Sequence, residues 1–299
     1  MAVRVRGFGV ARVVCVHGIG AQVSGGDVML KEWLPAVNSG LALTGAASLT
    51  SSEVAAGFYG DLFRPPGQFL SVGEPWFGPG DVEPGWEQEL LVRWWEASAQ
   101  TDAAVGLPGD RSLARTPVPV QAILHQLSKS RFFAGVAVRG MVGNVKQVRR
   151  YLFEPDLRER IRDRVRAVIT AETRVVVAHS LGSVVAYEAL CSTPDHRVAA
   201  LVTLGSPLGI PNLIFDRLDP TPVDGAAAWP GRSELVWTNI ADSGDVVALV
   251  KQLDPLFGDN FACRVWDAMV HNGVHAHSAV PYLTDTLTGR AIADGLHAH

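Results

Sequence analysis

Ser180 stands in a setting typical of a nucleophilic serine. It follows the apolar, β-branched run at 175–178 and precedes a segment compatible with a helix. Ala178 and Gly182 flank it two positions away on either side, where a tight turn needs small residues because it brings neighbouring backbones together. In such a strand–turn–helix the serine backbone is strained, its hydroxyl projects above the sheet, and the helix N-terminus favours developing negative charge. The pattern predicts nucleophilic catalysis by Ser180; the alternative is a structural turn of small residues without chemistry.

The segment 175–190 resembles the nucleophile motif of the α/β-hydrolase superfamily, in its lipase and serine-esterase branch. Ala178 stands at the position of the usual first glycine, a replacement familiar among bacterial lipases of that superfamily. The resemblance implies an α/β-hydrolase fold, with a mostly parallel central sheet flanked by helices and with a helical cap or lid insertion. It covers roughly residues 10–61 and 152–290 of the chain.

A second segment, HGIG at 17–20, follows an apolar strand and resembles the oxyanion segment of the same family. The resemblance implies that the backbone N–H groups of Ile19 and Leu181 stabilise the oxyanion. His17 is then expected to hold the loop by hydrogen bonds instead of acting as a base. A phosphate-binding loop is the alternative, but the segment lacks the Lys-Ser/Thr of a P-loop and the full GxGxxG spacing.

Two carboxylates follow the predicted strand at 234–240 and compete for the role of the acid. Asp245 directly precedes two valines and matches the Asp-x-Val pattern of the family, so the resemblance favours it. Asp242 is the alternative, and its other role would be to cap the turn through an Asx-type hydrogen bond. The acid holds the imidazole in the right tautomer and stabilises the imidazolium that forms.

The base is expected last, because the family has the chain order Ser, Asp, His. His271, His275 and His277 follow the last predicted strand. His277 precedes Ser278 and, a few residues on, Tyr282, and so resembles the catalytic histidine at the start of a C-terminal helix; His275 is the alternative. The spacing of the three histidines would also suit a metal. No HExxH glutamate and no cluster of Cys or carboxylates accompanies them in the sequence, so no metal is expected.

The elements that must position these residues follow an α/β pattern. Short apolar runs alternate with helical periodicity, which predicts a parallel sheet covered by helices. The expected strands are 12–16, 53–59, 173–178, 197–204, 234–240 and 261–266. Helices are expected at 27–38, with Asp27 as its N-cap, and at 156–170.

Residues 62–151 differ in composition and are expected to form a helical cap or lid insertion into a core of residues 1–61 and 152–299. Two loops dense in proline and glycine are followed by helical patterns near 87–100, 118–128 and 131–151. The aromatic residues of this region would line an acyl pocket or simply pack onto the sheet: Trp76, Phe77, Trp86, Trp94, Trp95, Phe132 and Phe133.

Composition limits the class of protein. The chain of 299 residues is 47% hydrophobic and 19% charged, which excludes a disordered protein. A formal net charge of −4 argues against a nucleic-acid partner. No apolar run approaches a membrane span and the start does not read as a secretory signal, so a cytoplasmic location is expected. The three cysteines have no CxxC spacing, and Cys15 and Cys263 are expected to be buried.

The resemblance implies a serine hydrolase that cleaves a carboxylic ester or thioester. Its site would comprise Ser180, His277, Asp245, Ile19 and Leu181. No cofactor is expected, and the expected partner is a small-molecule or acyl ester substrate. Two alternatives stay open: an acyltransferase or macrocyclising, lactonising enzyme that uses the same acyl-enzyme, and a non-catalytic hydrolase-fold binding protein.

Overall fold

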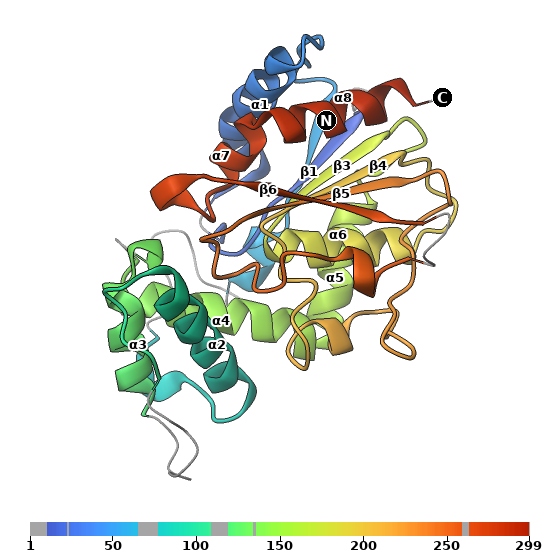
Figure 1. Ribbon diagram of the computed structural model, residues 1–299. Coiled ribbons are helices and arrows are strands. Elements are labelled where there is room, and N and C mark those ends of the chain that lie inside the picture. The colour runs from blue at the N-terminus through green and yellow to red at the C-terminus, as the bar shows by residue number, and fades with distance from the viewer. Residues whose placement is uncertain are drawn as a thin grey trace, which may run out of the picture.

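A six-stranded sheet forms the centre of the molecule (Figure 1). The computed structural model describes residues 11–22, 24–64, 77–108, 119–133, 136–258 and 263–298. Every strand pair in the sheet is parallel, and the order is β2-β1-β3-β4-β5-β6. The strands are β1 (Val13–Val16), β2 (Val54–Gly57), β3 (Val175–His179), β4 (Ala200–Leu204), β5 (Val236–Asp242) and β6 (Val265–Val270). The prediction of an α/β protein with a parallel sheet flanked by helices is confirmed.

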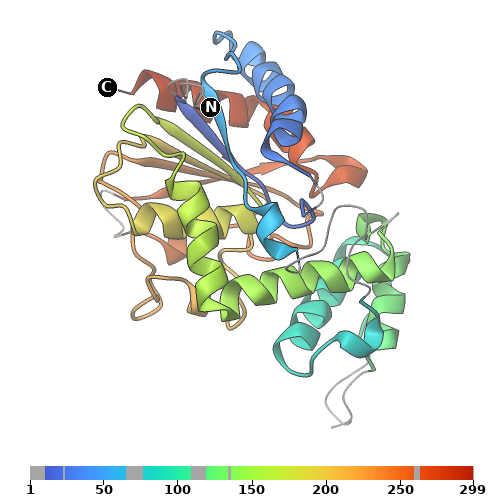
Figure 2. The ribbon, with the colours of Figure 1, turned by 180° about the vertical axis from the view of Figure 1, so that it is seen from behind.

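Helices cover both faces of the sheet (Figures 1 and 2). Helices α1 (Gly26–Leu43), α7 (Ala279–Thr284) and α8 (Thr286–His297) lie on one face, and α5 (Pro155–Arg166) and α6 (Leu181–Cys191) lie on the other. Side chains of a strand point alternately to the two faces. Val175 and Val177 therefore pack with the first group of helices, whereas Val176 and Ala178 pack with the second. Both faces are apolar, which is why these strands read as continuous hydrophobic runs.

The register of the sheet brings the two candidate loops together. Val16, the last residue of β1, is the partner of Ala178 in β3. The chain that leaves β1 at residue 17 therefore emerges beside the chain that leaves β3 at Ser180. Parallel strands end at one edge of a sheet, so the segment after Asp242 in β5 emerges at the same edge.

Some predicted boundaries were wrong. Gly25, not Asp27, is the N-cap of α1; Asp27 lies in the first turn, where its charge still favours the helix dipole. The single helix expected at 131–151 is a 3₁₀ turn, Arg131–Phe133, followed by a separate helix, because the backbone of Ala137 is extended. The last strand extends to Val270 because it pairs with β5 as far as Asp242.

One expected burial was wrong as well. Cys15 is fully buried in β1, but Cys263 is only half-buried. It precedes β6, which is an edge strand, so fewer neighbours cover it.

In the described residues between β2 and α5 there are three α-helices, which we call the insert helices. They are α2 (Trp86–Thr101), α3 (Val120–Lys129) and α4 (Val138–Phe153), and they lie to one side of the sheet (Figures 1 and 2). Their apolar faces pack on one another and continue into the core cluster that contains Val176 and Ala178. Trp76 lies outside the described residues, and Trp95 is buried with its indole N–H bonded to the Gly106 carbonyl.

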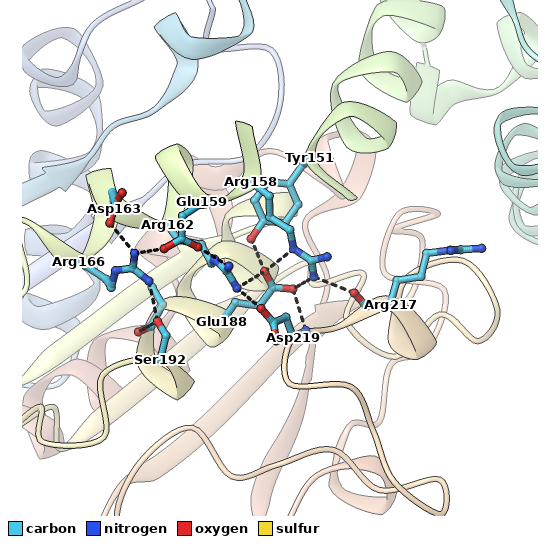
Figure 3. Close-up of polar contacts among 11 residues, drawn as sticks. Tyr151, Arg158, Glu159, Arg162, Asp163, Arg166, Glu188, Ser192, Arg217 and Asp219 are labelled. Atoms are coloured by element: carbon cyan, nitrogen blue, oxygen red, sulfur yellow. Dashed lines mark hydrogen bonds and ion pairs between the residues drawn. The ribbon is translucent and has the colours of Figure 1, made fainter. Parts of the chain in front are cut away.

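A buried carboxylate joins α4 and α5 to α6 (Figure 3). Glu188 of α6 is fully buried, and a buried charge is costly unless it is paired and hydrogen-bonded. The hydroxyl of Tyr151 donates to it at 2.6 Å and Nε of Arg158 at 2.9 Å. Burial, together with the negative charge of Glu188, raises the pKa of Tyr151, so the phenol remains a donor. These bonds hold the end of α4 and the start of α5 against the helix that begins beside Ser180.

The other carboxylates labelled in Figure 3 have more exposed side chains: Glu159, Asp163 and Asp219. Arg162 contacts Glu159 and Asp219, and Arg166 contacts Glu159 and Asp163. Exposed pairs contribute little because water and salt screen them. In the described part of the chain, no helix is both long enough and apolar enough to cross a membrane.

Candidate active site

Ser180 has the strained backbone that the sequence pattern predicts. It lies between β3 and α6 with φ 55° and ψ −132°, and only 1% of its surface is exposed. Residues other than glycine rarely adopt such a positive φ. A Cβ on Gly182 would lie 2.3 Å from the carbonyl oxygen of His17, and one on Gly18 would lie 2.6 Å from Cβ of Ser180. The small residues are therefore required by the close approach of two loops.

His277 bridges Ser180 and a carboxylate. Its Nε2 lies 2.9 Å from Oγ of Ser180, and its Nδ1 lies 2.8 Å from Oδ2 of Asp245. His277 follows the short turn after β6 and precedes α7. Its ring contacts Asp245 and Ser180, which lie 32 and 97 positions before it in the chain. A hydroxyl bonded to an imidazole that a carboxylate orients is the arrangement that activates serine for attack on a carbonyl.

Asp245 is buried and held in one orientation. Its Oδ2 also accepts a hydrogen bond from the Tyr282 hydroxyl at 2.9 Å, and its Oδ1 accepts one from the Val247 N–H at 2.9 Å. Burial by itself would raise the pKa of Asp245. The charge and hydrogen bond of His277, aided by Lys251 and by the Val247 N–H, outweigh it, so the pKa lies below its usual value. The side chain is thus a carboxylate that accepts from Nδ1–H of His277.

The competing residues occupy other positions. The carboxylate of Asp242 accepts hydrogen bonds from the backbone N–H of Gly244, at 2.7 Å, and from that of Asn272. It therefore caps the turn, which is the alternative role predicted for Asp242 from the sequence. His271 and His275 are exposed on the segment after β6. Among the described residues, no three His, Cys, Asp or Glu side chains gather into a potential metal site.

His17 supports its loop. Its Nδ1 lies 2.6 Å from the carbonyl oxygen of Gly18, and its Nε2 accepts the backbone N–H of Tyr59 at 3.2 Å. The Tyr59 hydroxyl donates in turn to the carbonyl of His17 at 2.6 Å. Burial lowers the pKa of His17 to about 4, so the ring is neutral. Both ring nitrogens are used within the loop and its neighbour, which leaves neither for proton transfer at Ser180.

The two residues expected to provide oxyanion donors lie beside Ser180. Ile19 and Leu181 line one cavity with it. Leu181 is the first residue of α6, and N–H groups in a first helical turn have no carbonyl partner within the helix. Gly20 binds the side chain of Gln147 in α4 through its N–H at 3.1 Å, which ties this loop to the insert helices.

Sequence reasoning missed three residues that shape the site. His179 Nε2 donates to the carbonyl of His277 at 2.7 Å, and burial, with a smaller effect of His277, lowers the pKa of His179 to about 3. Gly205 has φ 55°, and a Cβ on it would lie 2.6 Å from Oδ2 of Asp245. Tyr282 was noted only for its place after His277, whereas it binds the acid directly. Two of these residues had a signal in the sequence: His179 directly precedes the candidate nucleophile, and Gly205 directly follows β4.

The cavities in the described part of the chain include one lined by Ser180 and a larger one lined by Ala276, the chain neighbour of His277. One, of about 20 Å³, is lined by Ser180 and by apolar residues, including Trp94 and Val148 of the insert helices. The other, of about 380 Å³, is lined partly by Phe132 and Ala276. The ring of Phe132 lies 5.9 Å from that of His277. The smaller cavity has room for about one water molecule.

The neutral imidazoles of His17 and His179 predict that stability depends on pH. An imidazole in the unfolded chain has a pKa of about 6.5, whereas burial lowers the pKa to about 4 in His17 and to about 3 in His179. Between these values the unfolded chain binds more protons, so the free energy of unfolding falls as pH falls below 6.5. We expect each histidine to contribute a loss of about 2 kcal/mol between pH 6.5 and pH 5 in urea unfolding.

The control for this dependence is His125→Gln, since His125 is exposed on α3. It should leave the difference in unfolding free energy between pH 6.5 and pH 5 unchanged, whereas His179→Gln should reduce that difference. An equal difference in both variants would contradict a buried, neutral His179.

No protein-family model matches the chain, and searches of curated proteins and of solved structures gave no match either. The class of the protein therefore rests on its own structure: an α/β protein with a parallel sheet flanked by helices. At the carboxyl edge of that sheet it carries a partly buried chain of hydrogen bonds from Ser180 through His277 to Asp245.

Proposed function

We propose that the protein is a serine hydrolase of α/β-hydrolase type that cleaves a carboxylic ester or thioester. One observation carries the proposal: Oγ of Ser180 lies 2.9 Å from Nε2 of His277, whose Nδ1 lies 2.8 Å from Asp245. The positive φ of Ser180 at the start of α6 supports it further. Strained backbone conformations cluster at active sites, and a serine at such a strand-to-helix turn is the nucleophile arrangement of this type of hydrolase.

The proposed reaction has two halves. Oγ of Ser180 attacks the ester carbonyl while its proton passes to Nε2 of His277, and Asp245 stabilises the imidazolium. The N–H groups of Ile19 and Leu181 bind the oxyanion of the tetrahedral intermediate. The C–O or C–S bond of the substrate then breaks, and His277 protonates the leaving group. Water then attacks the acyl-enzyme while His277 takes its proton. The bond between the acyl carbon and Oγ breaks as His277 returns that proton to Oγ, which releases the acid and free Ser180.

The insert helices would act as a lid. Leu90, Trp94 and Val148 come from them and line the small cavity with Ser180. A cavity of about 20 Å³ is too small for an acyl chain, so binding requires the insert helices to move from the closed position described here.

Acyl transfer is a second candidate, and the apolar lining of the cavity beside Ser180 favours it. That cavity offers few polar groups to hold a hydrolytic water. An alcohol or amine bound in place of water would give transfer or ring closure from the same intermediate. Analysis of the products formed with and without added alcohols distinguishes the two reactions.

The proposal is tested by covalent labelling with a small fluorophosphonate. We expect one adduct, located on Ser180 by peptide mass spectrometry, because an activated serine attacks phosphorus as it attacks a carbonyl. Ser180→Ala should not be labelled, and His277→Ala should be labelled far more slowly. His275→Ala serves as the matched control and should react like the unmodified protein. Absence of an adduct on Ser180 would favour a binding protein without catalytic activity.

A further inference from the structure

The indole N–H of Trp94 is a buried donor without an acceptor. Trp94 lies in α2 with 3% of its surface exposed, and its Nε1 has no hydrogen-bond partner among the described residues. Leaving a buried donor unsatisfied is costly, and native proteins rarely do so without a reason. Four other indole groups of this chain do find acceptors: Trp86 (Leu213 carbonyl), Trp95 (Gly106 carbonyl), Trp229 (Arg232 carbonyl) and Trp237 (Thr203 hydroxyl).

Trp94 lines the small cavity beside Ser180. The other lining residues are apolar, namely Ile19, Leu90, Val148, Leu181, Pro207, Ile210, Ile214 and Val247. An indole N–H can only donate, so the group that satisfies it must be an acceptor. No charged side chain lines the cavity, and an apolar cavity disfavours an anion. A neutral oxygen is the acceptor that these surroundings suit.

The positions of the two cavities indicate which part of the substrate this oxygen belongs to. His277 delivers the proton to the leaving group, so the leaving group must lie on the side of His277. On that side the ring of Phe132 lies 5.9 Å from that of His277, and Phe132 and Ala276 line the larger cavity. The small cavity is lined by Ser180 itself and by Leu181, so an acyl group bound to Oγ of Ser180 lies next to it.

A second unsatisfied group lies one turn further along α2. Ser98 is fully buried, and its Oγ has no hydrogen-bond partner in the part of the chain that the structure describes. Trp94 and Ser98 are four residues apart and therefore share a face of the helix. Thr101 follows on that face and lines the larger cavity. Trp94, Ser98 and Thr101 thus lie in a row on one face of α2, and two of them, Trp94 and Thr101, each line a cavity.

We propose that the acyl part of the substrate carries a neutral oxygen, as an ether, ketone or hydroxyl, that accepts a hydrogen bond from the Trp94 indole. The inference rests on the proposed hydrolase function and specifies its substrate class: oxygenated acyl chains in preference to plain fatty acyl chains. Trp94 is then a specificity-determining residue, because a site built to bind a polar group rejects an analogue that lacks it.

The test uses p-nitrophenyl hexanoate and three analogues in which an ether oxygen replaces the methylene at carbon 3, 4 or 5. Their kcat/KM values are measured for the unmodified protein and for Trp94→Phe, and the ratio between the two proteins is taken for each ester. Intrinsic reactivity of an ester cancels in that ratio. We expect one oxygen position at which Trp94→Phe costs at least about tenfold more than it costs for the hexanoate.

Trp229→Phe is the matched control, because it also removes an indole N–H but one that the Arg232 carbonyl already accepts, outside both cavities. It should affect all four esters equally. If Trp94→Phe does not fold, the unmodified protein still tests the proposal. Its rate with each of the four esters is divided by the rate at which hydroxide hydrolyses the same ester, and this quotient must be highest for one position of the ether oxygen.

The role of Trp94 would be overturned if Trp94→Phe lowered kcat/KM by the same factor for all four esters. It would also be overturned if the rates of the unmodified protein, divided by those of hydroxide hydrolysis, showed no peak at any oxygen position. Either result leaves the hydrolase proposal intact. Failure to cleave any of the four esters, together with absence of phosphonate labelling, would instead overturn the proposed function and the inference with it.

Discussion

Ser180→Ala is expected to abolish ester hydrolysis while leaving the fold intact. The change removes one hydroxyl, and with it the atom that would form the acyl-enzyme. Because the three residues of such a site act as a unit, the loss in kcat should be about 10³- to 10⁶-fold. The measurement is steady-state hydrolysis of p-nitrophenyl esters of graded length by purified variant and unmodified protein.

The fold should survive this substitution because alanine fills nearly the same volume at a position with 1% exposure. The lost hydrogen bond to His277 is worth about 1 kcal/mol, so Tm should change by only a few degrees. Thermal unfolding and circular dichroism provide the control. Activity that persists in a well-folded Ser180→Ala protein would show that Ser180 is not the nucleophile.

The second large effect is expected at the other two residues of the hydrogen-bonded chain. His277→Ala removes the group that accepts the proton of Ser180. Asp245→Asn replaces one carboxylate oxygen by an NH2 donor. At the position of Oδ2 this donor cannot accept from His277 and Tyr282, and at the position of Oδ1 it opposes the N–H of Val247. Each should lower kcat by about 10³- to 10⁴-fold.

The competing residues provide the matched controls. Asp242→Asn and His275→Ala should change kcat by less than about tenfold, because Asp242 binds backbone N–H groups of its turn and His275 is exposed. If Asp242→Asn lowered kcat as strongly as Asp245→Asn in a folded protein, the assignment of the acid would have to be reversed. A loss of activity with chelators that zinc restores would instead favour metal chemistry.

Much of the fold could be predicted because its signals are local. The β-branched runs of β1 and β3 and the helical periodicity between strands depend only on neighbours in the chain. The turn at Ser180 is local as well, since Ala178 and Gly182 lie two residues from it. Boundaries were less certain where pairing decides them: β6 reaches Val270 because β5 is there to pair with it.

Other features were decided only by the tertiary structure. From the sequence, Asp242 or Asp245 could be the acid and His275 or His277 the base, and the preference for Asp245 and His277 came from the resemblance to the hydrolase family. The contact between Asp245 and His277 exists because β5 and β6 are neighbours in the sheet and release their loops at one edge.

The surroundings of the site had no local signal at all. The hydrogen bond from His179 to the carbonyl of His277 joins residues 98 positions apart. The unsatisfied indole of Trp94 is visible only once α2 is packed beside Ser180. The sequence by itself determined which residue types and turns were present. The order of the strands determined which of them meet, because side chains distant in the chain interact only where the sheet brings their loops together.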